Sequence, residues 1–133
     1  MGIFMKVTFS IISLTVIVVF SEITVTAHEW MAPKEKAKIQ NPLPAEPEII
    51  SHGKNLYLQL CSYCHGDNLA GLPSEITGLT KPTPNLKARL KTHSDGDFFW
   101  KIQNGKGDMP SFKDDLNDEE IWSILRFTRS EMN

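Results

Sequence analysis

The chain has 133 residues, which is the length of one domain. Its apolar fraction of 41%, charged fraction of 23% and net charge of −2 exclude a disordered tail, a collagen-like repeat and the strongly basic surface that nucleic-acid binding requires. Its two cysteines are too few for a disulfide framework or a four-sulfur metal site.

The first 27 residues have the pattern of a secretory signal peptide. Lys6 is the only charged residue before Glu22, the segment between them is largely apolar, and residues 25–27 (Val-Thr-Ala) form a cleavage signal. An uncleaved membrane anchor is the alternative, although the apolar run is shorter than the roughly 20 residues of a spanning helix. We therefore expect an exported, periplasmic protein that contacts the membrane only if residues 1–27 are retained.

Residues 28–47 are predicted to form an N-terminal arm without a helix. Pro42, Pro44 and Pro47 remove backbone hydrogen-bond donors and favour an extended chain. Two interpretations of the arm remain open, because Trp30 could dock on the domain surface or the whole arm could be a solvated linker. The folded domain is then predicted to cover residues 48–133.

Helical periodicity begins at Glu48. Apolar residues three to four positions apart, together with Gly53, predict a helix that ends near Cys64. An irregular segment rich in glycine and proline follows, from residue 66 to residue 86. About twenty residues without regular structure are unusual in a compact domain unless they serve a function.

Three further helices are expected, two of them from their caps. A short helix is predicted over residues 86–90. Ser94 is a predicted N-cap, and residues 104–105 (Asn-Gly) end the helix that it begins. Asn117 and Glu120 predict a capping box at the start of the last helix. No alternating pattern of strand length occurs, so the predicted fold class is all-α.

The segment from Cys61 to His65 has the spacing C-x-x-C-H, which is the attachment signal for c-type haem. Two thiols add to the vinyl groups of the macrocycle, and a histidine directly after the second cysteine can reach the iron. A zinc half-site would need two more ligands at usual spacings, and a thioredoxin-like redox pair would need a βαβ unit. Neither pattern occurs. A plain disulfide stays open, because an exported chain is in an oxidising compartment.

On these residues the chain resembles the small class I cytochromes c over about residues 48–130. Gly53, Tyr57 and Cys61 match the family's glycine, aromatic residue and first cysteine at four-residue steps. Ile124 and Phe127 match the apolar and aromatic pair of its last helix. The resemblance implies about three to five helices around one covalently attached haem c and its iron. It also implies that the first and last helices cross closely at the glycine.

The resemblance also implies two iron ligands, His65 on the proximal side and Met109 on the distal side. Met109 lies in a polar, glycine-rich loop before Pro110, where a methionine that merely fills a core is not expected. His93 is the alternative distal ligand, although its place beside a helix cap is more typical of a solvated surface residue. His52 lies about 20 Å along the helix of the cysteines and cannot reach the distal side.

Two further haem-binding residues follow from the resemblance. The family uses a proline carbonyl after the cysteine motif to accept a hydrogen bond from the ligand histidine, and Pro73 is the matching proline. Trp100 and residues 84–86 match walls of the haem pocket. For Trp100, ordinary core packing is the alternative.

These expectations describe a periplasmic monohaem cytochrome that exchanges single electrons with redox partner proteins by outer-sphere transfer. Because both axial positions of the iron are expected to be filled, the chain is predicted not to be an enzyme. The alternative is an electron-entry haem subunit of a larger oxidoreductase complex, with the arm as its docking element. An open iron with peroxidase-type chemistry would require that Met109 is not bound.

Overall fold

The computed structural model describes residues 30–132, and this part of the chain contains seven helices. They are α1 (Lys34–Ala37), α2 (Pro47–Leu60), α3 (Ser62–His65), α4 (Ser74–Thr77), α5 (Leu86–Leu90), α6 (Asp95–Asn104) and α7 (Asp118–Ser130). The all-α prediction is confirmed. Seven helices exceed the predicted three to five because α1, α3, α4 and α5 are single turns of four or five residues. The predicted signal peptide, residues 1–27, lies outside the described residues.

Three helices, α5, α6 and α7, begin at a side chain that accepts a hydrogen bond from a backbone N–H group of the first turn. Ser94 accepts from the amide of Asp97 at the start of α6. Asn117 and Glu120 form a complete capping box at the start of α7, with hydrogen bonds of 3.0 and 2.8 Å. The cap predictions for both helices are therefore confirmed. Helix α5 also has an N-cap, because the side chain of Asn85 accepts a hydrogen bond from the amide of Ala88.

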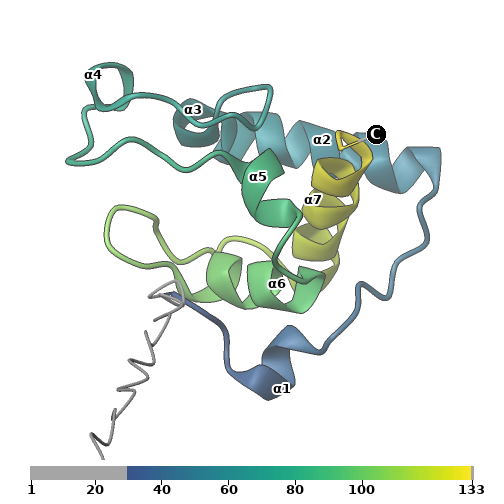
Figure 1. Cartoon of the computed structure of the whole chain (residues 1–133). Helices are drawn as coiled ribbons and strands as arrows, with labels where there is room; N and C mark the ends of the chain where they lie inside the picture. Colours follow the sequence, from purple (N-terminus) through teal and green to yellow (C-terminus); the bar gives the residue numbers. More distant parts are fainter. Residues whose placement is uncertain (1–29, 133) are drawn as a thin grey trace, which may run out of the picture.

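The crossing of α2 and α7 forms the centre of the fold (Figure 1). A Cβ atom on Gly53 would lie 1.9 Å from the carbonyl oxygen of Ser123, so the two backbones approach as closely as only glycine allows. One turn further along α2, the ring of Tyr57 packs on that of Phe127, with 5.3 Å between their centroids. The predicted close crossing is confirmed.

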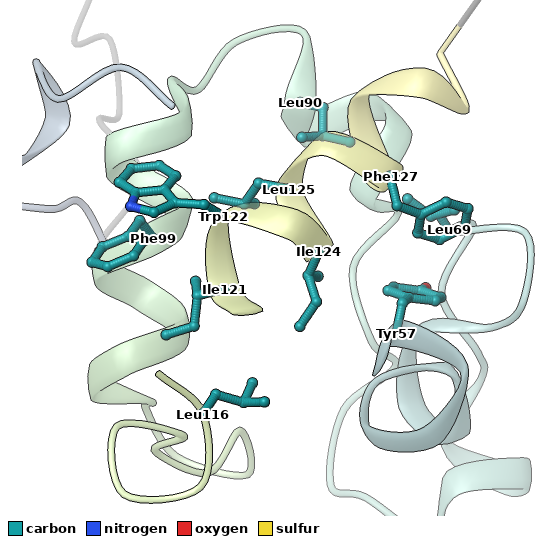
Figure 2. Close-up of a cluster of buried hydrophobic side chains, with 10 residues drawn as sticks. All are labelled: Tyr57, Leu69, Leu90, Phe99, Leu116, Ile121, Trp122, Ile124, Leu125 and Phe127. Atoms are coloured by element: carbon teal, nitrogen blue, oxygen red, sulfur yellow. The ribbon is translucent and has the colours of Figure 1, made fainter. Parts of the chain in front are cut away.

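The hydrophobic core extends from this crossing to α6 (Figure 2). Phe99 of α6 stacks on Trp122 of α7 with their ring centroids 4.1 Å apart. Ile124 and Leu125 are both 2% exposed, so α7 is enclosed on nearly every side. The ten buried members are Tyr57, Leu69, Leu90, Phe99, Leu116, Ile121, Trp122, Ile124, Leu125 and Phe127.

The N-terminal arm contains a helix, which the sequence prediction excluded. The three prolines lie at residues 42–47, and α1 forms before them, where the carbonyl of Pro33 accepts the amides of Lys36 and Ala37. Pro47 itself begins α2, because a proline at the first helical position loses no hydrogen bond.

The arm also docks on the domain, which settles the choice between a docked arm and a solvated linker. The amide of Ala32 donates to the buried Asp97 carboxylate at 2.7 Å, and Lys101 binds the same carboxylate at 2.5 Å. The Lys101 ammonium lies 5.6 Å from the centre of the Trp30 ring. Gly96 allows close contact, because a Cβ there would lie 2.2 Å from the carbonyl oxygen of Lys36.

A second set of contacts holds the end of the arm on α7. The Asn41 side chain donates to the carbonyl of Trp122 at 2.9 Å. The Arg126 guanidinium donates to the carbonyls of Leu43 and Asn41 at 2.6 and 3.1 Å. The arm is therefore fastened at both ends, to α6 and to α7. Within residues 30–132, no helix is both long and apolar enough to cross a membrane.

Asp97→Ala should release the arm and destabilise the protein. The change would leave the Lys101 ammonium buried without its partner, and breaking such a pair costs about 3–5 kcal/mol. Trypsin should cleave faster at Lys34, Lys36 and Lys38, and the midpoint of chemical denaturation should fall. Asp114→Ala, at an exposed position, is the control. Equal cleavage rates and midpoints in the two variants would contradict the role given to Asp97.

Candidate functional site

One helical turn brings the two cysteines and the histidine of the C-x-x-C-H motif together. α2 ends at Leu60, and α3 begins at Ser62, so that only Cys61 lies between the two helices. The carbonyl of Cys61 accepts the amides of Cys64 at 3.2 Å and His65 at 2.9 Å. The predicted helix to Cys64 is therefore interrupted at Cys61, and this break separates the motif from α2 as a turn of its own.

Both thiols are free and half-buried. Burial raises the pKa of the Cys61 thiol to about 12, and the neighbouring Cys64 adds to the shift. The thiol of Cys61 is therefore protonated at neutral pH. The structure does not show the disulfide that the sequence left open. Among residues 30–132, no group of three His, Cys, Asp or Glu side chains is placed to hold a metal ion.

The His65 imidazole has a buried nitrogen without a partner. Its Nδ1 atom makes no hydrogen bond of normal geometry within the described part of the chain. Burial lowers the pKa of His65, and the backbone of Pro84 lies close enough to oppose that shift. The imidazole is therefore held in its neutral form, the form in which histidine binds a metal.

The structure places Pro84, rather than the predicted Pro73, beside this imidazole. The carbonyl of Pro73 has a different use, because it accepts the amides of Ile76 and Thr77 at the start of α4. The prediction for Pro73 is therefore wrong. The error arose from choosing the proline nearest in sequence, while the chain between residues 66 and 83 folds back and brings Pro84 to the histidine.

The loop that carries Met109 is a tight turn. The amides and carbonyls of Lys106 and Met109 bind each other reciprocally, at 2.9 and 3.1 Å. Gly105 and Gly107 have φ angles of +62° and +58°, which glycine adopts without strain. Met109 is half-buried, and the loop is tied back to α6 by Ser111, which donates to the carbonyl of Gln103.

The Met109 loop contacts the segment that follows the cysteine motif. Thr80 donates to the carboxylate of Asp108, the neighbour of Met109, at 3.2 Å. Figure 1 shows that the loop before α5 and the loop after α6 extend toward the same side of the molecule. This hydrogen bond therefore links the loop that carries Met109 to the segment that follows His65 in the chain.

Trp100 and His93 have different environments. Trp100 is half-buried and does not belong to the buried core, where Phe99 takes the position against Trp122. Core packing is thus not its role, and a place in the haem pocket remains a prediction. His93 is only 8% exposed, so the expected surface histidine is wrong. Its Nδ1 lies 3.0 Å from the carbonyl of Arg89, and its own carbonyl accepts from Arg129.

Two hydroxyl groups that were not predicted from the sequence donate hydrogen bonds to backbone carbonyls in or next to the motif. The hydroxyl of Tyr57 donates to the carbonyl of Gly66 at 2.7 Å, and burial raises its pKa far above the usual value. The hydroxyl of Thr83 donates to the carbonyl of Cys64. A tyrosine in an apolar helix stripe does indicate a hydroxyl that needs a partner, but no local signal marked Thr83.

The described residues fit a haem c. The site offers two free thiols at the attachment spacing, and a neutral imidazole that interacts with the backbone of Pro84. A histidine whose second ring nitrogen is oriented by a carbonyl is the usual form of a metal-binding histidine. A half-buried methionine on a loop that is linked to the motif side supplies a thioether.

Comparisons with known proteins agree with this arrangement. The family model described as cytochrome c oxidase, cbb3-type, subunit III matches residues 48–127. Among curated proteins, the quinohemoprotein alcohol dehydrogenase ADH IIB of Pseudomonas putida is 31% identical over 100 residues, which are 74% of this chain. The chain spans only 14% of the length of that dehydrogenase.

Proposed function

This chain belongs to the family of cytochrome c oxidase, cbb3-type, subunit III, and we propose that it is a periplasmic monohaem carrier of electrons between redox partner proteins. As a cytochrome c it binds covalently attached haem c and transfers electrons. The haem supplies the one-electron chemistry of its iron, and the chain sets the ligands, the burial and the surface around it.

We assign four residues to the haem. Cys61 and Cys64 form the thioether bonds, and His65 binds the iron from the motif side. The backbone of Pro84 interacts with one side of the His65 imidazole, which leaves the other ring nitrogen for the iron. Met109 would supply the second iron ligand. The observation that carries the assignment is the Thr80–Asp108 hydrogen bond, which joins the Met109 loop to the segment that follows His65.

A second candidate function is an electron-entry haem subunit of a larger oxidoreductase. The similarity to a stretch of a quinohemoprotein alcohol dehydrogenase supports it, because there the matching residues are a small part of a longer chain. Co-purification of this protein with a larger oxidoreductase at fixed stoichiometry would favour the subunit. A single homogeneous haem protein of about the mass of this chain would favour the free carrier.

Export is part of the proposal. Residues 1–27 have the signal-peptide pattern, and haem attachment occurs on the oxidising side of the membrane. N-terminal sequencing of the mature protein should begin at His28 if the signal is cleaved after Ala27. A protein that retains residues 1–27 and sediments with membranes would support the uncleaved anchor.

The wild-type protein should keep its haem in acidified organic solvent. Thioether bonds resist this treatment, so the denatured protein should carry the mass of one haem. The double variant Cys61→Ala with Cys64→Ala should release any haem that it binds, while Ser62→Ala, which leaves the spacing intact, should behave as wild type. Purified wild-type protein without covalent haem, from cells able to attach it, would contradict the proposal.

A further inference from the structure

The hydroxyl of Thr83 joins three parts of the chain around the cysteine motif. It lies within hydrogen-bond distance of the carbonyl of Cys64, and it accepts the amide of Leu72 at 2.6 Å. The carbonyl of Leu72 lies 3.1 Å away, but it already accepts the amide of Thr83. The hydroxyl has one proton, and the Cys64 carbonyl is the nearer acceptor, so that carbonyl receives it.

The backbone on both sides of His65 is held by similar contacts. The carbonyl of His65 accepts the amide of Gly71 at 2.9 Å, and the carbonyl of Gly66 accepts the hydroxyl of Tyr57 at 2.7 Å. Three consecutive carbonyls, of residues 64, 65 and 66, therefore have partners. Gly71 lets the chain approach, because a Cβ there would lie 2.3 Å from the carbonyl oxygen of Thr83.

Thr83 also directly precedes Pro84, the residue whose backbone faces the imidazole. One side chain thus fixes the carbonyl before His65 and the chain segment that brings Pro84 to the ring. We propose that Thr83 is a positioning residue, which sets the orientation of the His65 imidazole against Pro84 and through it the reduction potential of the haem. This inference rests on the proposed function, in which His65 binds the iron.

The test compares Thr83→Val, which removes the hydroxyl at nearly constant shape, with Thr83→Ser, which keeps it. A carbonyl that accepts from the second ring nitrogen makes a histidine a stronger donor, and a stronger donor favours ferric iron. Thr83→Val should therefore raise the reduction potential. In the ferrous protein, NMR should show about tenfold faster solvent exchange of the His65 ring N–H proton, as expected when one buried hydrogen bond is lost. Thr83→Ser should restore both values.

Thr92→Val is the matched control, because Thr92 is an exposed threonine whose hydroxyl contacts Arg89 and His93. A Thr83→Val protein with the potential and exchange rate of this control would overturn the inference, even if its stability were lower. If Thr83→Val accumulates without haem, Thr83→Ser decides. Full haem content and wild-type potential in the serine variant support the proposal, and haem loss there contradicts it. Wild-type protein without histidine-ligated haem would instead contradict the proposed function itself.

Discussion

Gly53→Val should be the most damaging single substitution in the first helix. The first carbon of any side chain at this position would lie 1.9 Å from the carbonyl oxygen of Ser123 and 2.3 Å from its carbon. These are backbone atoms of α7, which cannot rotate away as a side chain can. Overpacking of a core typically costs about 1–3 kcal/mol, and here we expect a cost at or above the upper end of that range.

The measurement is the midpoint of chemical denaturation, together with the yield of haem-containing protein. Gly53→Ala should also be strongly destabilising, although alanine in place of glycine normally favours a helix. Ser51→Ala, at an exposed position of α2, is the control and should leave the midpoint nearly unchanged. A Gly53→Val protein with the wild-type midpoint would show that α2 and α7 do not cross as described.

Met109→Ala should change the electronic properties of the protein more than any other substitution outside the cysteine motif. A thioether is a soft, neutral ligand that favours ferrous over ferric iron, so its removal should lower the reduction potential. The iron–sulfur charge-transfer band of the ferric protein should disappear, and binding of cyanide or peroxide should become faster. Met109→His should remain six-coordinate, with a markedly lower potential.

Two controls separate ligation from general effects on the fold. Met31→Ala removes a thioether from an exposed residue of the arm and should leave the spectrum unchanged. His93→Ala should weaken the fold, because His93 is buried and bound to Arg89 and Thr92, but it should not remove the charge-transfer band. A Met109→Ala protein with the wild-type spectrum and potential would remove Met109 from the ligand assignment.

The features that could be predicted are those that the sequence encodes locally. The caps at Ser94 and Asn117 depend on residues three positions away, and both are present as expected. The crossing at Gly53 was implied by the resemblance to the small class I cytochromes c, and a glycine in a helix interior agrees with close packing at that position. The C-x-x-C-H spacing carries its chemistry within five residues. In each case the interpretation needed no knowledge of the path of the chain elsewhere.

The features that were missed depend on contacts between distant segments. Pro84 reaches His65 only because the chain between residues 66 and 83 doubles back, and Thr83 contacts Cys64 across 19 positions. The arm docks through Asp97, which lies 65 positions from Ala32, and no residue near Ala32 indicates this contact in the sequence. His93 is buried, and its carbonyl accepts a hydrogen bond from Arg129 of α7, 36 positions away. Sequence patterns name candidate residues in such cases, but the fold selects among them.

The docked arm bears on how this cytochrome can be joined to other polypeptides. The family match begins at residue 48, yet the contacts of α6 and α7 with the chain begin at residue 30. A fusion made at residue 48 would remove the arm residues that bind Asp97 and Arg126. The Asp97–Lys101 ion pair and the Arg126 guanidinium would then be exposed to water. A junction placed ahead of residue 30 would keep those contacts, so the portable unit for a chimeric oxidoreductase is about 18 residues longer than the family boundary indicates.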